Sequence, residues 1–342
     1  MEYRGKYTVF DSRKIRTYPI SERPNKVKLS DIMDPDKIRS KTFEADAETE
    51  RSISEIAGEV RSARKKGKPV ILFAGAHLIK NGLGRVVIDL VRRGTITLVA
   101  GNGATAIHDF ELAMIGETSE HVPQALEKGR FGMAHEFACH NAALSKGNRH
   151  RLGYGETLGK TICDASFRRE AFALAAEEGA PVTFRHPEIS VLAACYGHGV
   201  PFTVHAGIGT DVTDQHPSFD GEAKGGASGR DFLVFVDEVA KMAGGGVVLN
   251  VGSAVTGPEV LLKAVSMASN AGKPPNGLIA ADFDLRARQP QNIDESEEGY
   301  YYRDQKSVVS RIPASFHGKG YYIQGNEKTT VPLLYQKIVE PA

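Results

Sequence analysis

Tryptophan, long apolar runs and any marked net charge are missing from this sequence of 342 residues. No apolar run approaches the ~20 residues that a membrane-spanning helix needs, so we expect no membrane segment. The net charge of +1 leaves no basic surplus for binding nucleic acid or an acidic membrane surface. Residues 1–19 also lack the continuous apolar segment of a secretory signal peptide. The absence of tryptophan excludes nothing by itself.

Cysteine is scarce as well. The three cysteines, Cys139, Cys163 and Cys195, lie far apart in the chain, and their odd number does not fit a disulfide framework. We therefore expect reduced thiols and a cytoplasmic protein.

Glycine, by contrast, is abundant, with 36 residues that lie mostly at the ends of expected elements. Short apolar runs, typical of buried strands, alternate with segments of helical periodicity. The expected strands are residues 70–74, 96–100, 201–205, 246–251 and 277–283, with a last strand at 321–323. The expected helices are 48–66, 77–93, 104–115, 158–178, 187–196, 230–242, 258–270 and 330–339. This alternation predicts an α/β fold with one doubly wound, mostly parallel, Rossmann-like sheet.

The domain organisation follows from where this alternation begins. Residues 1–45 have no clear period, and they predict an irregular N-terminal arm with one short turn at 29–33. The arm either wraps a neighbouring subunit or its own domain, or it forms a partly ordered tail. Residues 46–342 are expected to form a single α/β domain, with a helical insertion near 117–156 that holds no obvious strand.

Glycines and polar side chains follow the strand expected at 96–100. The Gly-Asn-Gly turn at 101–103 would let a phosphate or a ribose approach the backbone, and the start of the next helix adds a partial positive charge. His108, Asp109 and Glu111 lie near the start of that helix, where imidazole and carboxylate groups together suit acid–base catalysis. The GxGxxG dinucleotide fingerprint is absent. The alternative is a turn whose polar side chains only cap the helix.

A second polar cluster follows the strand expected at 201–205. His205, Asp211, Asp214 and His216 lie in one loop, and loops of this composition hold catalytic or ribose-binding groups on a rigid scaffold. One alternative is a divalent metal held by His205, Asp211 and His216. No closely spaced ligand pair supports zinc, so we expect no metal. The other alternative is a surface loop built from Asx turns.

Two further strand ends carry small or acidic residues. Gly252 and Ser253 follow one strand, and Asp282 ends the next. A carboxylate at a strand end commonly binds a ribose diol, although Asp282 also suits an N-cap or a turn. Because the carboxyl ends of parallel strands share one edge, these residues should converge on one pocket with those described above.

Four segments resemble deoxyhypusine synthase and its bacterial relatives. They are FAGAHLIKNGLGRVVIDLVRRGTITLVAGNGA with IHDFE (within 73–111), GHGVPFTVHAGIGTD (197–211), GGGVVLNVGSAV (244–255) and GKGYYIQGNEKTTVPLLYQKIVE (318–340). The resemblance implies a Rossmann-like sheet that binds NAD, a homotetramer built as a dimer of dimers, and active sites at the dimer interface. Together with the strand-end pattern, it implies cofactor contacts at Ala76, His77, Asn102, Gly103, Ala104, Asp211, Gly252, Ser253 and Asp282. The NAD-binding part of archaeal ornithine cyclodeaminases is also similar, more faintly.

The chain departs from the synthase family at its reactive positions. That family's catalytic lysine lies in a Trp-Gly-Lys motif before the last strand, whereas residues 306–312 read KSVVSRI. Its paired histidines are replaced here by the Thr-Gly-Pro of 256–258. The resemblance therefore implies the fold and the cofactor, and not deoxyhypusine synthesis.

These observations predict an NAD-dependent enzyme with transferase or oxidoreductase-type chemistry on a small amine or amino-acid-like substrate. The expected catalytic and substrate-orienting residues are His108, Asp109, Glu111, His205, Asp214 and His216. Lys80 and Lys306 are candidates for imine formation. Two alternatives stay open: an NAD-independent hydrolase or lyase that uses the loop 205–216, and a non-catalytic nucleotide-binding module.

Overall fold

A six-stranded parallel sheet forms the core of the protein in the computed structural model, which describes residues 3–175, 183–289 and 295–340. Its strands are β2 (Val70–Ala74), β3 (Leu98–Gly101), β5 (Phe202–Val204), β6 (Val247–Val251), β7 (Ile279–Asp284) and β8 (Lys319–Gln324). The order in the sheet is β5-β3-β2-β6-β7-β8, and all neighbours pair in parallel. The first strand of the sheet, β2, thus lies in the middle, with β3 and β5 added on one side of it. The later strands β6, β7 and β8 are added in turn on the other side, which is the Rossmann order. The predicted fold class is confirmed.

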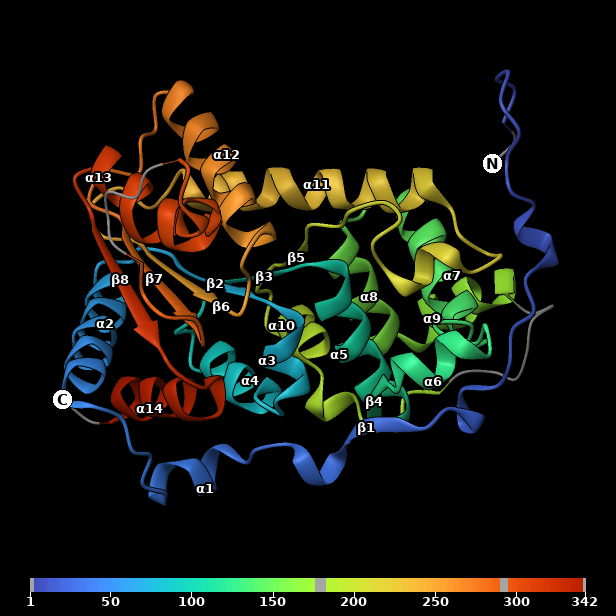
Figure 1. Cartoon of the computed structure of the whole chain (residues 1–342), viewed down its shortest axis with the longest axis horizontal. Helices are drawn as coiled ribbons and strands as arrows, with labels where there is room; N and C mark the ends of the chain where they lie inside the picture. Colours follow the sequence, from blue (N-terminus) through green and yellow to red (C-terminus); the bar gives the residue numbers. More distant parts are fainter. Residues whose placement is uncertain (1–2, 176–182, 290–294, 341–342) are drawn as a thin grey trace.

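Helices cover both faces of this sheet (Figure 1). Side chains alternate along β2, so that Val70 and Leu72 pack on one face and Ile71 and Phe73 on the other. The helices of the first face are α2 (Ala47–Lys65), α4 (Gly84–Arg92) and α14 (Glu327–Val339). Those of the second are α11 (Gly221–Val239), α12 (Thr256–Asn270), α13 (Ile312–Ser315) and a π-helix (Gln305–Arg311). All five side chains of β2 are buried, which explains why the strand is a continuous apolar run in the sequence.

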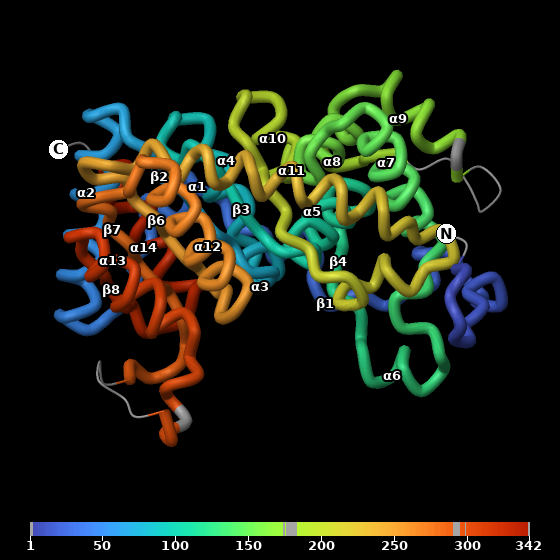
Figure 2. Tube along the Cα trace, turned by 90° about the horizontal axis from the view of Figure 1, so that it is seen from above, coloured from blue at the N-terminus to red at the C-terminus, as the bar shows by residue number. Residues whose placement is uncertain are grey.

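A helical region lies beside the sheet, and α11 extends from one to the other (Figure 2). This region contains α5 (Gly103–Ile115), α6 (Val122–Glu127), α7 (Phe137–Arg149), α8 (Tyr154–Cys163), α9 (Ala165–Phe172) and α10 (Val191–Gly197). The short helix α3 (Ala76–Lys80) follows β2 and packs against α5. The helical region therefore borders the carboxyl ends of β2, β3 and β5.

The N-terminal arm lies along its own chain. It contains β1 (Asn25–Lys28) and α1 (Pro35–Ser40), and β1 pairs in antiparallel fashion with β4 (Glu117–Glu120). The prediction that the segment after Gly116 holds no strand is therefore wrong. Both strands are four residues long and mostly polar, so neither has the apolar alternation by which a strand is recognised in a sequence. Their pairing depends on a partner about 90 residues away.

Three predicted helices also differ clearly from the structure, and the one expected at 77–93 is divided into α3 and α4. The helix α11 begins at Gly221 instead of residue 230, because Asp220 caps it and the glycine-rich first turns pack Lys224 and Ala227 inward. The single helix expected at 158–178 is two helices, since Asp164 ends α8 and caps α9. The last part of that prediction lies outside the described residues. Within the described ranges, no helix combines the length and the apolar character needed to cross a membrane.

Candidate functional site

Two pockets adjoin at the carboxyl ends of β3 and β5, and they share Ala104, Thr210 and Asp211 in their walls. The small pocket has a volume of about 250 Å³. Its charged and imidazole side chains are Arg23, Lys80, His108, Glu111, Glu120 and Asp211. The large pocket has a volume of about 630 Å³, and it is lined by the start of α5, the loop after β5 and the start of α11. Its volume lies in the range of cofactor sites.

The N-terminus of α5 forms one wall of the large pocket. Asn102 caps this helix, because its Oδ1 accepts a hydrogen bond of 2.9 Å from the backbone N–H of Thr105. A Cβ atom on Gly103 would overlap the carboxylate of Asp211, so this close approach requires glycine. The negative charge of Asp211 thus lies at the positive end of the α5 dipole.

A buried lysine holds the loop that follows β5. Lys224 Nζ lies 2.7 Å from Asp211 Oδ2 and 2.5 Å from Asp214 Oδ1, and it donates to the carbonyl oxygen of Gly207 at 3.1 Å. Burial raises the pKa of Asp211, and the charge of Lys224 opposes that shift. Lys224 has no signal in the sequence, because it lies in a glycine-rich stretch that resembles a loop. Asp220, four positions earlier, is the one sequence feature that could have indicated a helix starting there, because it is the N-cap of α11.

A chain of polar contacts runs from His108 to the N-terminal arm. His108 Nδ1 lies 2.6 Å from Thr118 Oγ1, and the Thr118 hydroxyl donates to Glu111 Oε2. Glu111 Oε1 in turn lies 2.7 Å from Arg23 Nη1. Burial acts to raise the pKa of Glu111, but the charge of Arg23 and the contact with His108 outweigh it and lower that pKa to about 2. Thr118 and Arg23 were not found in the sequence, because Thr118 lies in β4 and Arg23 just before β1, and neither segment carries a motif.

His77 and Lys80 belong to α3, beside the same chain. Burial, followed by the charges of Lys80 and His108, lowers the pKa of His77. Of the two α3 residues, only Lys80 lines the small pocket, where it joins His108 of α5.

His205 lines the large pocket, but its ring is packed among aromatic side chains. It stacks on Phe73 with 5.5 Å between ring centroids and meets the edge of Phe235 at 5.2 Å. Its Nε2 lies 3.1 Å from Thr203 Oγ1. Burial lowers the pKa of His205 to about 3, so that the ring is neutral near pH 7. His216 is not part of either pocket wall, and burial lowers its pKa to about 4.

Asp109 faces away from both pockets. Its carboxylate accepts hydrogen bonds from Ser190 Oγ (2.6 Å) and from the backbone N–H groups of Val191 (2.8 Å) and Leu192 (3.0 Å). It therefore holds the start of α10 against α5. One helical step of about 100° separates it from His108, which explains why neighbours in the sequence face different surroundings.

Asp109→Ala is expected to lower the free energy of unfolding by roughly 2–4 kcal/mol, because three buried donors lose their acceptor. Burial raises the pKa of Asp109 from 3.8 to about 6. The folded state holds this proton more tightly, so the associated stability is present below pH 4 and is lost as the pH rises through about 6. Urea unfolding at pH 4 and pH 7 should show the larger deficit at pH 4. The exposed Glu188→Ala is the control, and an equal effect of the two variants would contradict the assignment.

The remaining predicted cofactor residues belong to neither pocket wall. Four of them lie at the β2–β6 switch point, and Asp282 lies on β7. Ala76 and His77 begin α3, and Gly252 and Ser253 follow β6. A Cβ atom on Gly75 would overlap the carbonyl oxygen of Gly252, so the two turns are in contact. Asp282 is buried, its Oδ1 accepts a 2.6 Å hydrogen bond from Asn250 Nδ2, and burial raises its pKa strongly.

No three His, Cys, Asp or Glu side chains lie close enough together to hold a metal ion in the described part of the chain. His205, Asp211 and His216 are thus not assembled as a ligand set.

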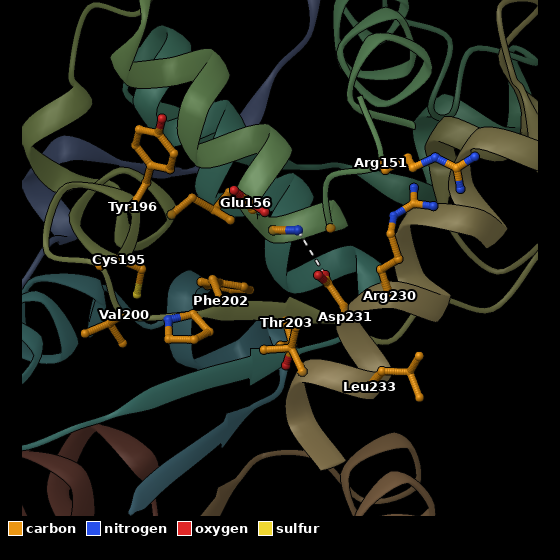
Figure 3. A pocket seen from close by; sticks show the side chains of 16 residues that line it. Arg151, Glu156, Cys195, Tyr196, Val200, Phe202, Thr203, Arg230, Asp231 and Leu233 are labelled. Atoms are coloured by element: carbon orange, nitrogen blue, oxygen red, sulfur yellow. Dashed lines mark hydrogen bonds between the residues drawn. The ribbon is translucent and has the colours of Figure 1, made fainter. Parts of the chain in front are cut away.

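A third pocket of about 580 Å³ lies at the outer edge of β5, between α8, α10 and α11. Figure 3 shows Asp231 among the side chains that line this pocket, with a hydrogen bond to the backbone of α8. The Asp231 carboxylate accepts from the backbone N–H groups of Gly155 (3.0 Å) and Val204 (2.7 Å), and burial raises its pKa to about 7. Its acceptors are used by the scaffold, so Asp231 closes the edge of β5 instead of serving a ligand.

Comparison with known proteins places this chain near ornithine cyclodeaminases, although no family model matches it. It is 24% identical to the ornithine cyclodeaminase of Archaeoglobus fulgidus over 208 residues, which are 61% of this chain and 42% of that protein. It is 34% identical over 64 residues to the bifunctional arginine dihydrolase/ornithine cyclodeaminase AgrE of Nostoc sp., covering 19% of this chain and 9% of that protein. A crystal structure of AgrE in a ternary complex with ornithine and NAD+ covers 87% of this chain and 34% of AgrE, with 18% identity and a TM-score of 0.46. The chain thus spans less than half of the curated relatives that it matches.

The resemblance to deoxyhypusine synthase is therefore wrong, and the fainter likeness to archaeal ornithine cyclodeaminases is the one that the comparison confirms. Apolar strands followed by glycine turns are a requirement of every Rossmann-like sheet, so they identify the fold and not the family. The missing Trp-Gly-Lys motif was the more specific signal. The expected homotetramer and transferase chemistry, which came with that resemblance, lose their support.

Proposed function

We propose that this protein is an NAD-dependent enzyme that acts on a small amino acid, with ornithine as the first candidate. One observation carries the proposal: a cofactor-sized and an amino-acid-sized pocket adjoin at the carboxyl edge of a Rossmann sheet and share Asp211. The names of the curated relatives and the AgrE complex with ornithine and NAD+ agree with it.

The large pocket suits NAD. Gly103 keeps the start of α5 free of a side chain, and Asp211, which Lys224 neutralises, offers a carboxylate to ribose hydroxyls. Asn102 and Ala104 complete this wall. NAD would supply a hydride acceptor when bound.

The small pocket suits a zwitterion, because its wall carries both signs of charge. His108 is placed to move a proton there: Thr118 holds its Nδ1, which leaves Nε2 for the substrate. Glu111 stays ionised and orients Thr118. Lys80 lies in the same wall as His108, and its ammonium favours an anionic group at this end.

Calorimetric titration with NAD, NADP and ADP-ribose tests the cofactor half of this proposal, and release of ammonia from L-ornithine in the presence of NAD tests the substrate half. We expect heat with NAD and NAD-dependent release of ammonia. No heat with any of the three nucleotides would contradict NAD binding. Heat with NAD but no ammonia would leave the cofactor assignment and reject ornithine.

A further inference from the structure

Arg23 is an unusual member of the small pocket, because it is buried and only partly paired. It is 6% exposed. Its Nε donates to Asn25 Oδ1 at 2.9 Å, and its Nη1 lies 2.7 Å from Glu111 Oε1. Its Nη2 is buried without a hydrogen-bond partner among the described residues. A buried charged donor that is left unsatisfied costs stability, so this atom needs an acceptor.

The carboxylates of the same pocket already have ion-pair or hydrogen-bond partners, although Glu111 Oε1 accepts no well-directed hydrogen bond among the described residues. Glu111 has Arg23 and Thr118, and Glu120 accepts from the Tyr18 hydroxyl at 2.8 Å and from the backbone N–H of Gly132 at 3.0 Å. Asp211 is paired with Lys224. Arg23 Nη2 therefore needs an acceptor that these carboxylates do not supply.

The structure also holds Arg23 rigidly. Arg23 lies two residues before the first residue of β1, Asn25, which is paired with Glu120 of β4. Its guanidinium lies 5.8 Å from the centre of the Phe137 ring. A donor that is fixed before a ligand arrives loses little entropy on binding. Lys80, in the same pocket wall, forms no ion pair within the described ranges.

We propose that Arg23 of the N-terminal arm, through Nη2, binds the carboxylate of the amino-acid substrate in the small pocket, with Lys80 as the second cation. This inference rests on the proposed function in that the substrate is an amino acid. Arginine suits the role because its fork presents parallel donors, so that Nη1 serves Glu111 while Nη2 serves the ligand. The arm thereby selects α-amino acids over the corresponding amines.

The test compares L-ornithine with 1,4-diaminobutane, which is ornithine without the carboxylate, on the NAD-loaded protein. Wild type should bind ornithine at least about tenfold more tightly than the diamine, since one charge-assisted hydrogen bond corresponds to a factor of about 10–100. Arg23→Gln should lose this preference through weaker ornithine binding, with the affinity for NAD unchanged. Arg130→Gln changes a partly exposed arginine that pairs with Glu22 of the arm and lies outside the pocket wall, so it is the matched control and should behave as wild type.

Arg23→Lys guards against misfolding, because the shorter lysine keeps a positive charge for Glu111 but lacks the planar fork that holds a second donor at the position of Nη2. It should keep the melting temperature near that of wild type and still lose the preference for ornithine. Equal binding of ornithine and diamine by wild type would overturn the inference, as would an unchanged preference in Arg23→Lys. If wild type binds neither NAD nor ornithine, the proposed function fails by itself. Titration with propionate then decides the inference, since binding that Arg23→Lys weakens supports it and no binding overturns it.

Discussion

Replacing Lys224 by methionine is expected to lower the free energy of unfolding by about 3–5 kcal/mol, because two buried carboxylates lose their counter-charge. The side chain of Lys224 is only 2% exposed and contacts both Asp211 and Asp214. Each carboxylate keeps its desolvation cost after the change, and neither can reach bulk water without moving the loop. Urea unfolding at pH 7 measures the loss, and calorimetry should show weaker NAD binding because Asp211 no longer holds its position.

Lys241→Met is the control for this prediction. Lys241 follows α11 directly and also contacts two carboxylates, Asp237 at 2.8 Å and Glu238 at 2.9 Å, but its side chain is 55% exposed. Solvent screening limits the value of such pairs to about 0–1 kcal/mol. The triple variant Lys224→Met/Asp211→Asn/Asp214→Asn should recover part of the lost stability, since it removes the uncompensated charges. A loss at Lys224 no larger than that at Lys241 would show that the buried cluster does not hold the loop.

His108→Gln is expected to lower kcat for the amino-acid substrate by about 10²–10⁴-fold, with little change in the affinity for NAD. Glutamine keeps a polar group near Thr118 but cannot accept and return a proton. Steady-state kinetics with L-ornithine and calorimetry with NAD separate the two effects.

Thr118→Val tests the positioning of His108, since valine removes the hydroxyl that joins His108 to Glu111. We expect a smaller loss of kcat than for His108→Gln, together with a changed pH profile. His150→Gln serves as the histidine control, because His150 lies at the C-terminus of α7 outside both pocket walls. A kcat of His108→Gln equal to that of His150→Gln would remove His108 from the reaction.

The strands of the main sheet could be predicted because their burial requires apolar side chains at successive positions. β2 and β6 are buried on both faces, and such strands are continuous apolar runs bounded by glycine or proline. Parallel pairing of such strands predicts that Gly103, His205 and Asp211 lie at one edge of the sheet. Because the glycine turns follow from the same geometry, they could not distinguish one Rossmann-like family from another.

Only some residues of the candidate site could be predicted from the sequence. Some residues of the site follow apolar strands closely in the sequence and could therefore be predicted, namely His108, Glu111 and Asp211. Others lie in polar stretches without a motif and could not, namely Arg23, Thr118 and Lys224. Asp109 shows the opposite error, since its neighbour His108 made it a catalytic candidate although it caps α10. Helix phase and partners from distant segments decide such cases.

By itself, the sequence determined the alternation of strands and helices, the edge at which the candidate site lies, and most of the polar groups of that site. Only the tertiary structure decided which of these groups share a pocket. It brings Arg23 from the arm and Thr118 from β4 to Glu111, and Lys224 from α11 to Asp211. The physical reason is that burial of apolar side chains leaves a local, periodic pattern in the chain. A buried charge is stabilised instead by a partner from elsewhere, and no local pattern records which one.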